Sequence, residues 1–279
     1  MKFYKKHISP KKQIMKRIIP FIFLLIITSM IAYCFYFEPN KLEVNKITIY
    51  DKELSRIKIV FVSDFHIKPH QQKRLKKIVE TINEQKPDIV LSAGDYVSGH
   101  SELLTMPIDK IAKGLGEIKS KYGFYTSLGN HDKYLGTERI RTALEEYKIT
   151  VLNNENIKIN TNGKDIYIAG IQYKPKKQSV VNKALEGTKS PVIVLTHSPD
   201  EFYKIPNNVN LILAGHTHGG QVVLPFIGAI LTGSIYRDRF LYSLKELDGK
   251  KIITTRGIGV SILPLRFNCP PEIMVIEFK

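Results

Sequence analysis

The segment GHTHGGQ, at residues 215–221, directly follows an apolar run at residues 209–214 that has the composition of a buried strand. Its two histidines stand two positions apart, so on extended backbone their imidazoles would point to the same side. The neighbouring glycines carry no Cβ and let the backbone approach a bound group closely. Because open α/β sheets place their sites at the carboxyl ends of strands, the segment predicts a metal site in which the two histidines hold two different ions.

The rest of the chain alternates apolar runs with amphipathic segments. This alternation predicts an α/β fold with a largely parallel sheet in the first half, and a second sheet with helices outside it in the second half. The expected strands are Lys46–Tyr50, Ile57–Ser63, Ile89–Ala93, Phe124–Leu128, Asn156–Asn160, Asp165–Ile171, Val192–Thr196, Val209–Ala214, Val222–Leu224, Phe240–Leu244, Lys251–Thr255 and Ile273–Phe278, and the expected helices are Gln71–Glu84, Ile108–Lys121, Glu138–Tyr147 and Ser179–Glu186.

Five of these strands end in a short polar group that contains Asp, Asn or His. Neutral imidazole, carboxylate and amide oxygen suit Zn, Mn or Fe better than a metal that selects thiolate. The two cysteines, Cys34 and Cys269, lie in an apolar segment and near the C-terminus, so neither a disulfide framework nor cysteine ligation is expected. The five groups are Asp64-x-His66, Gly94-Asp95, Gly129-Asn130-His131-Asp132, His197 and His216-Thr217-His218.

In this order the five groups resemble those of the calcineurin-like metallophosphoesterases, and the resemblance covers roughly residues 45–279. It implies a four-layer α-β-β-α sandwich with two divalent ions, Mn, Fe or Zn, at the sheet edges. It further implies that a hydroxide bridging the ions attacks phosphorus in line, and that His131 acts as general acid. The implied ligands are Asp64, His66, Asp95 and His218 for one ion, and Asp95, Asn130, His197 and His216 for the other, so Asp95 bridges the two.

Taken singly, these residues also have ordinary structural interpretations. Asp64 or Asp95 would serve as a turn residue or helix N-cap, and His197 as a hydrogen-bonded core histidine. Asp132 is expected to be structural, because it follows His131 directly and so points elsewhere. The histidines that match no motif are expected at the surface; they are His7, His70 and His100.

Residues 18–37 contain no charged side chain, and about 20 apolar residues suffice to span a bilayer as a helix. Seven lysines and arginines precede the first acidic residue, Glu38. We therefore expect residues 1–17 to form a basic cytoplasmic segment, 18–37 a single-pass anchor in the cell membrane, 38–44 a linker, and 45–279 an extracytoplasmic catalytic domain. The alternative is a cleaved signal peptide, which the bulky residues at 35–37 disfavour.

The formal net charge of +16 invites a nucleic-acid interpretation, but its distribution does not support one. Without the seven basic residues of the N-terminal segment, +9 remains, and it is spread along the chain. A diffuse positive surface suits anionic lipid or polymer at least as well as DNA, so nucleic acid is not an expected partner.

The glycines and glutamine at 219–221 and the motifs at 256–259, 264–267 and 271–273 resemble a membrane-associated bacterial branch of the family, similar to YkuE and YaeI. That branch is similar to the UDP-2,3-diacylglucosamine hydrolases. The resemblance therefore implies phosphodiester or pyrophosphate bonds in lipid-linked or nucleotide-sugar-lipid substrates, and a place in lipid metabolism. Gln172-Tyr173 departs from the pattern, because relatives often have acidic residues there.

Two features bear on an amphiphilic phosphoester substrate. Residues 222–236 are almost uncharged and directly follow the paired histidines, so they form either an apolar lip for acyl chains or a core strand with its loop. Arg266 is a candidate for bidentate binding of a substrate phosphate, and a structural ion pair is its alternative role.

Other functions stay open at this point. A nuclease or cyclic-nucleotide phosphodiesterase would need a continuous basic groove or stacking aromatic side chains near the site. A non-catalytic, metal-dependent binding protein would be expected to have lost some of the ligands, whereas every implied ligand is present in this chain.

Overall fold

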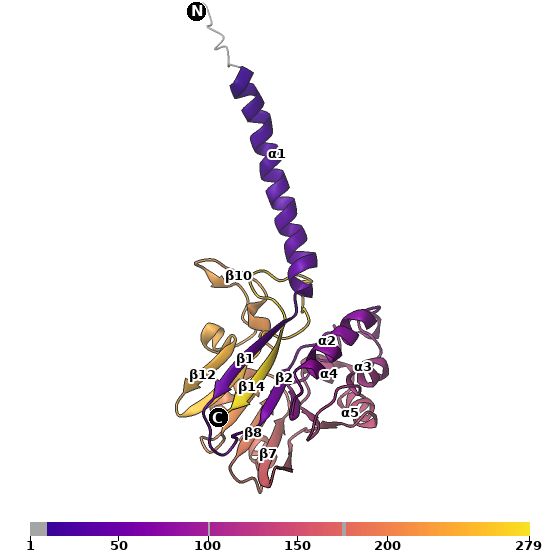
Figure 1. The fold of residues 1–279 in the computed structure, drawn as a ribbon, viewed down its shortest axis with the longest axis vertical. Helices are drawn as coiled ribbons and strands as arrows, with labels where there is room; N and C mark the ends of the chain where they lie inside the picture. The colour runs from indigo at the N-terminus through magenta and orange to yellow at the C-terminus, as the bar shows by residue number, and fades with distance from the viewer. Residues whose placement is uncertain (1–9, 100, 175–176) are drawn as a thin grey trace, which may run out of the picture.

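The computed structural model describes residues 10–99, 101–174 and 177–279, with two six-stranded sheets at the centre of its folded domain (Figure 1). In the first sheet the strand order is β1-β14-β2-β3-β4-β5. Strands β2 to β5 run parallel, whereas β14 runs antiparallel to β2 and parallel to β1. The bounds are β1 Glu43–Ile49, β2 Lys58–Val62, β3 Ile89–Ser92, β4 Phe124–Thr126, β5 Ile149–Val151 and β14 Glu272–Phe278.

The second sheet has the order β12-β13-β9-β8-β7-β6. Its four central strands run parallel, and the outer strands β12 and β6 pair antiparallel with their neighbours. A separate hairpin pairs β10 with β11. The bounds are β6 Glu155–Thr161, β7 Lys164–Ile171, β8 Val192–Thr196, β9 Leu211–Ala214, β10 Val223–Leu224, β11 Gly228–Ala229, β12 Ser243–Leu247 and β13 Lys250–Thr254.

Successive residues of the central strands pack on opposite faces of their sheet, which explains why these strands are apolar throughout. In β2, Val60 and Val62 pack with the helices, whereas Ile59 and Phe61 pack between the two sheets. Helices α2, α3 and α5 cover the outer face of the first sheet (Figure 1), and α6 covers the second. The layers confirm the predicted α-β-β-α sandwich; the helices are α2 Gln72–Glu84, α3 Ile108–Leu115, α4 Asn130–Leu135, α5 Thr137–Glu146 and α6 Gln178–Ala184.

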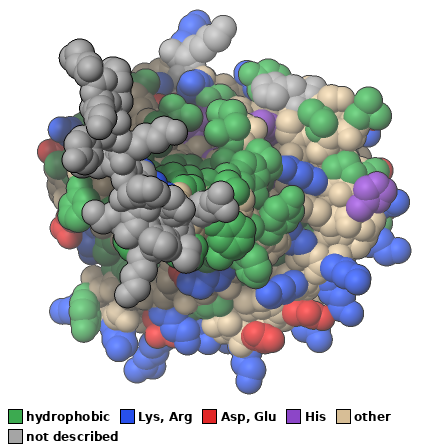
Figure 2. All heavy atoms as spheres, turned by 90° about the horizontal axis from the view of Figure 1, so that it is seen from above, with side chains coloured by type: hydrophobic (Ala, Val, Ile, Leu, Met, Phe, Trp, Pro, Cys, Tyr) green, Lys and Arg blue, Asp and Glu red, His purple; other side chains and the backbone are tan. Residues whose placement is uncertain are grey.

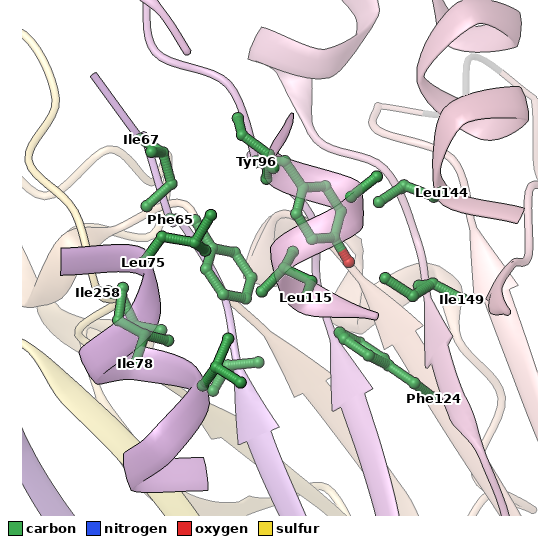
Figure 3. Close-up of a cluster of buried hydrophobic side chains, with 14 of the residues drawn as sticks. Phe65, Ile67, Leu75, Ile78, Tyr96, Leu115, Phe124, Leu144, Ile149 and Ile258 are labelled. Carbon is green, nitrogen blue, oxygen red and sulfur yellow. The ribbon is translucent and has the colours of Figure 1, made fainter. Parts of the chain in front are cut away.

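Apolar residues next to the polar groups anchor the loops that carry them. Phe65 lies between Asp64 and His66 in sequence, and its side chain points into the helix-side core (Figure 3). There it stacks on Tyr96, the residue after Asp95, with ring centroids 5.0 Å apart. Alternate residues of each loop thus face the core and the sheet edge, so the core fixes where the polar side chains lie.

Several elements differ from the sequence prediction. The expected strand Phe240–Leu244 is instead the end of the 3-10 turn Arg237–Phe240 and the start of β12. Phe240 is buried against Phe202, so its apolar character reflects tertiary packing and not a strand. Helix α3 was expected to reach Lys121, but it ends at Leu115, and Gly116 forms its C-cap. Helix α4 and strand β5 were not predicted.

Helix α1, Pro10–Ala32, stands away from the sheets (Figure 1) and continues through a π-helical turn, Tyr33–Phe37, into a 3-10 turn, Glu38–Asn40. Within this helical run, the candidate span Ile18–Asn40 contains an 18-residue window that has a mean hydropathy of 2.5 and no buried residue. By length and composition this helix suffices to cross a membrane. The expected basic segment is described only from residue 10 onward, and His7 and His100 lie outside the described residues, whereas His70 is exposed.

Candidate metal centre

The polar groups predicted as ligands come together at one edge of the two sheets. The loop after β2 carries Asp64 and His66, the loop after β3 carries Asp95, and α4 begins with Asn130 directly after the loop that follows β4. From the second sheet, β8 leads to His197, and β9 leads to the paired histidines. Five of the seven side chains are buried, and the two at intermediate exposure are Asn130 and His216.

The backbone at the site is not extended as the histidine spacing had suggested. His216 and His218 have φ of 69° and 51°, in the left-handed region that bulky residues rarely adopt. Asp64, His66 and Asp95 share this conformation, with φ of 54°, 43° and 57°. Such backbone costs free energy and persists where surrounding contacts hold it, which is common at functional sites. The paired histidines therefore reach the site through a turn and not through an extension of β9.

One cluster of donor atoms contains Asp64, His66 and His218. The Nε2 atom of His218 lies 3.4 Å from Oδ1 of Asp64 and 3.2 Å from Nε2 of His66. The Nδ1 atom of His66 lies 3.0 Å from the carbonyl oxygen of Val97. Because a carbonyl oxygen only accepts, Nδ1 carries the proton, and the unprotonated Nε2 faces the cluster.

A second cluster gathers around His197. Its Nε2 atom lies 3.0 Å from Oδ1 of Asn130 and 3.2 Å from both Oδ2 of Asp95 and Nδ1 of His216. Its Nδ1 atom lies 2.7 Å from the carbonyl oxygen of Ala93, which fixes the ring orientation in the same way.

Asp95 joins the two clusters. Its Oδ2 atom lies 3.6 Å from Nε2 of His66 and 3.2 Å from Nε2 of His197, so a single oxygen faces both. Its Oδ1 atom accepts the backbone N–H of His131 at 2.8 Å. A carboxylate held in this way can serve two cations at once, which an imidazole cannot do.

The electrostatics of the donor set fit bound cations. Burial raises the pKa of Asp64 to about 6, and burial lowers the pKa of His66 to about 4 and that of His216 to about 3. Burial opposes charge on His197 as well, but the Asp95 carboxylate raises the pKa of His197 to about 9. The carboxylates of Asp95 and Asp64 thus favour the protonated, positively charged form of His197. A divalent cation bound at the centre would replace that proton as the source of positive charge.

Two glycines make the close approach of the loops possible. A Cβ at Gly129 would overlap the Asp95 carboxylate and the ring of His197. A Cβ at Gly215 would overlap the side chain of Ser63 and the Asp64 carboxylate. Both positions exclude any side chain, because the ligands themselves occupy the space.

Asp132 lies behind the cluster, as its expected structural role requires. Its Oδ2 atom accepts the backbone N–H groups of Asp95 at 2.7 Å and Gly129 at 2.9 Å, and Oδ1 accepts that of Tyr96 at 2.9 Å. One buried carboxylate therefore holds the Asp95 loop against the start of α4.

We expect Asp132→Asn to lower activity by roughly 10- to 100-fold, the usual cost of losing a partner behind the ligands. The amide NH₂ would face a backbone N–H where a carboxylate oxygen now accepts, so the Asp95 loop should shift. Metal content measured at limiting metal should fall in parallel, whereas the exposed control Asp109→Asn should change neither quantity. Full activity with full metal content would contradict this positioning role.

His131 lies beside the first cluster without forming part of the implied ligand set. Its Nδ1 atom lies 3.0 Å from the carbonyl oxygen of Gly99, and its ring meets the His66 ring edge-to-face at 4.6 Å. One of its ring nitrogens lies within 4.8 Å of donor atoms of His66 and Asp95. The residue therefore sits where it can exchange a proton with a group bound at the centre.

The sequence did not single out Tyr173 as a site residue, beyond noting its departure from the family pattern. Its ring packs against those of His197 and His216, with centroids 5.5 Å and 5.3 Å apart. The only signal in the sequence was that Gln172-Tyr173 departs from the family pattern. That departure does not reveal which rings lie against Tyr173.

The structure gives Arg266 neither of the two roles considered for it, phosphate binding or an ion pair. It is fully buried, and its guanidinium donates to the carbonyl oxygens of Arg256, Gly257, Gly259 and Cys269. The prediction that Arg266 binds a substrate phosphate is therefore wrong. Its partners are backbone carbonyl oxygens, so it does not form the alternative ion pair either. Arg266 fastens the C-terminal loops to one another.

The centre opens into a cavity of about 870 Å³. Polar ligands occupy its floor, and apolar side chains from three other segments line its walls. The residues contributed by the centre are His66, Asp95, Asn130, His131, His216 and His218.

Comparison with known proteins agrees with this geometry. Residues 57–220 match the family described as Calcineurin-like phosphoesterase. The chain is 30% identical over 263 residues to Phosphodiesterase YaeI of Escherichia coli, covering 90% of this chain and 93% of that protein. It is 31% identical over 271 residues to the metallophosphoesterase YkuE of Bacillus subtilis, covering 89% of each.

A third relative is the Transmembrane protein with metallophosphoesterase domain of Danio rerio, 30% identical over 246 residues, covering 82% of this chain and 54% of that protein. The fold, the converging donor atoms and these similarities lead to one conclusion. The chain belongs to the calcineurin-like phosphoesterases and is a metal-dependent phosphoester hydrolase.

Proposed function

We propose that the chain is a membrane-anchored hydrolase that cleaves phosphodiester or pyrophosphate bonds with two divalent cations. Residues 18–37 anchor it, and the domain from residue 45 onward carries the reaction outside the cytoplasm. One observation carries the two-cation proposal: Oδ2 of Asp95 faces His66 and His197, which belong to different clusters. A single-ion site would have no need of a carboxylate in this position.

The proposed ligands follow from the two clusters. Asp64, His66, Asp95 and His218 would hold one ion, and Asp95, Asn130, His197 and His216 would hold the other. When bound, the cations would lower the pKa of a shared water and neutralise charge on the phosphate oxygens.

The protein's own residues complete the chemistry. Asp95 would serve both ions, and the Val97 and Ala93 carbonyls orient the imidazoles of His66 and His197 with Nε2 toward the Asp95 carboxylate. His131 would deliver a proton to the leaving oxygen from Nε2 of its imidazolium form, since Nδ1–H donates to the Gly99 carbonyl oxygen and the ring lines the cavity.

The substrate we propose is amphiphilic, with a phosphoester or pyrophosphate group joined to one or more apolar chains. The cavity supports this, because apolar residues at 230–231 and 262–264 line it next to the polar floor. Lys68 is the single lysine or arginine among the described residues that line it. A nuclease would need a continuous basic groove, so this lining disfavours nucleic acid as substrate.

The test uses the full-length protein, purified in detergent, stripped of metal and reloaded with Mn²⁺, Fe²⁺ or Zn²⁺. We expect two ions per chain by mass spectrometry and hydrolysis of bis(p-nitrophenyl) phosphate with at least one metal. Chelation should abolish turnover and lower the melting temperature, since bound ions at 100 times their Kd stabilise by about 2.7 kcal/mol. One ion per chain at saturation, or turnover that survives chelation, would refute the proposal.

A further inference from the structure

Exposed apolar side chains surround the mouth of the site cavity. They come from the segment before α3, from the β10–β11 hairpin with the residues after it, and from the loop at 260–264. We call this set the apolar rim. Each member is more than half exposed, and Phe226 is fully so; the members are Leu103, Leu104, Phe226, Ile227, Ile230, Leu231, Ile262 and Leu263.

The apolar rim is continuous with the catalytic cavity. Six of its eight members line the cavity, and Phe226 and Ile227 at the hairpin tip are the two that do not. A soluble surface rarely leaves so many large apolar side chains together in contact with water. The arrangement therefore points to an apolar partner that meets the protein at the cavity mouth.

The rim lies level with the end of the apolar helix. The backbone N–H of Arg266 donates to the carbonyl oxygen of Cys34 at 3.0 Å, and Cys34 belongs to the apolar stretch. The backbone N–H of Cys269 donates to the carboxylate of Glu38, just past the end of that stretch. The β10 hairpin lies beside the same end of α1 (Figure 1). A bilayer spanned by α1 would end at the height of the rim.

The loops of the rim are fastened to each other. Gln221 accepts the backbone N–H of Ser261 at 2.5 Å and donates to the carbonyl oxygen of Leu263 at 3.2 Å. The backbone N–H of Val223 donates to the carbonyl oxygen of Phe267 at 2.9 Å. Because one side chain joins the loops on either side of the cavity, they present a common surface.

Positive charge borders this surface. Seen along α1, hydrophobic side chains, those of the helix among them, occupy the middle of the view, and lysine and arginine side chains lie around its edge (Figure 2). Beside the helix end, Lys73, Arg74 and Lys77 line a second cavity of about 370 Å³ together with Asn40. Basic groups at this height favour contact with anionic lipid headgroups.

We propose that the apolar rim rests in the boundary between headgroups and acyl chains of the bilayer that α1 spans. The cavity then opens onto the membrane surface, and a lipid phosphoester enters from the side while its apolar chains stay in the bilayer. This inference rests on the proposed anchoring and hydrolysis. The bilayer is the occupant, because the rim shares its height with the helix end and has cations at its edge.

The first test reads the surroundings of the rim directly. The chain contains no tryptophan, so one introduced tryptophan is the only one present. The Phe226→Trp variant of the full-length protein is reconstituted into phosphatidylcholine–phosphatidylglycerol vesicles. We expect its tryptophan fluorescence to peak at a shorter wavelength than that of a tryptophan exposed to water. Lipids brominated on their acyl chains should quench it by roughly twofold or more, as for a side chain at the acyl boundary.

Tyr50→Trp is the matched control, because Tyr50 is 77% exposed and follows β1 at the end of the domain away from α1 (Figure 1). It should emit as a water-exposed tryptophan and escape quenching. Equal emission and equal quenching for the two positions would overturn the inference.

The second test compares a soluble and a membrane-bound probe with the same leaving group. Phe226→Asn/Ile227→Ser changes only the hairpin tip, and asparagine tolerates the positive φ of 66° at Phe226. We expect hydrolysis of hexadecyl p-nitrophenyl phosphate in vesicles to fall about tenfold as the rim loses apolar area. Hydrolysis of soluble bis(p-nitrophenyl) phosphate should stay within about twofold, because neither residue lines the cavity.

The two probes separate this inference from the proposed function. Failure of the unmodified protein to hydrolyse either probe would refute the proposed phosphodiester hydrolysis itself. Turnover of both probes that is unaffected by the hairpin change would overturn the membrane contact and leave the hydrolase proposal standing.

Discussion

Replacing Asp95 by alanine is expected to lower hydrolysis of bis(p-nitrophenyl) phosphate at least about 1,000-fold, the size of loss seen when a transition state loses an electrostatic stabiliser. The Oδ2 atom of Asp95 lies between His66 and His197, so its removal takes a ligand from both clusters at once. It also removes the acceptor of the His131 backbone N–H. The bound metal should fall from two ions per chain to one or none.

The measurement pairs metal analysis with kinetics on the same preparation. Asp95→Asn is the informative companion, because it keeps the shape of the side chain and loses its charge. Asp109→Ala, at an exposed position on α3, is the control and should behave as the parent protein. Circular dichroism should show that Asp95→Ala retains its fold. If folded Asp95→Ala turned over at even a tenth of the parent rate, the bridging role would be untenable.

Replacing His131 by glutamine is expected to separate catalysis from metal binding. Loss of a general acid costs about 10²- to 10⁴-fold in rate. Because His131 lies outside the proposed ligand set, both ions should remain bound. The loss should be largest for a diester with an alkoxide leaving group, which needs the proton most, and smallest for p-nitrophenolate, which leaves without help.

The comparison between leaving groups carries this test. His70→Gln is the matched control, since His70 is exposed and lies away from the metal centre. A rate loss of the same size for both leaving groups would argue against proton donation by His131. Loss of a metal ion in His131→Gln would argue that this histidine is a ligand.

Much of the site was predictable from the sequence because the chemistry repeats at strand ends. Each apolar run that ended in Asp, Asn or His became a strand leading to the same sheet edge. The spacing of Asp64 and His66 around Phe65 let one loop serve both core and site. Helix α4 was missed because Asn130 and His131 were interpreted as site residues, and together with Asp132 they also form its first turn.

The backbone at residues 215–221 was not predictable in the same way. Histidine disfavours positive φ, so no local preference signals the turn at His216. The Asp64 carboxylate holds it by accepting the His216 backbone N–H at 3.0 Å, and that contact joins residues from opposite halves of the chain. Arg266 was misjudged for a related reason, because a fully buried arginine satisfied by carbonyl oxygens leaves no mark in the sequence.

Under the proposed membrane anchoring, the junction between helix and domain decides how this enzyme meets its substrate. Helical turns run unbroken from Pro10 to Asn40, and β1 begins at Glu43, so only two residues link the helical segment to the first strand of the domain. The Cys34–Arg266 hydrogen bond ties them further. If α1 spans a membrane as proposed, a domain joined to it this closely would stay at the lipid surface. Its turnover of the proposed membrane-bound substrate should then follow the surface density and lateral diffusion of that substrate and not the bulk volume.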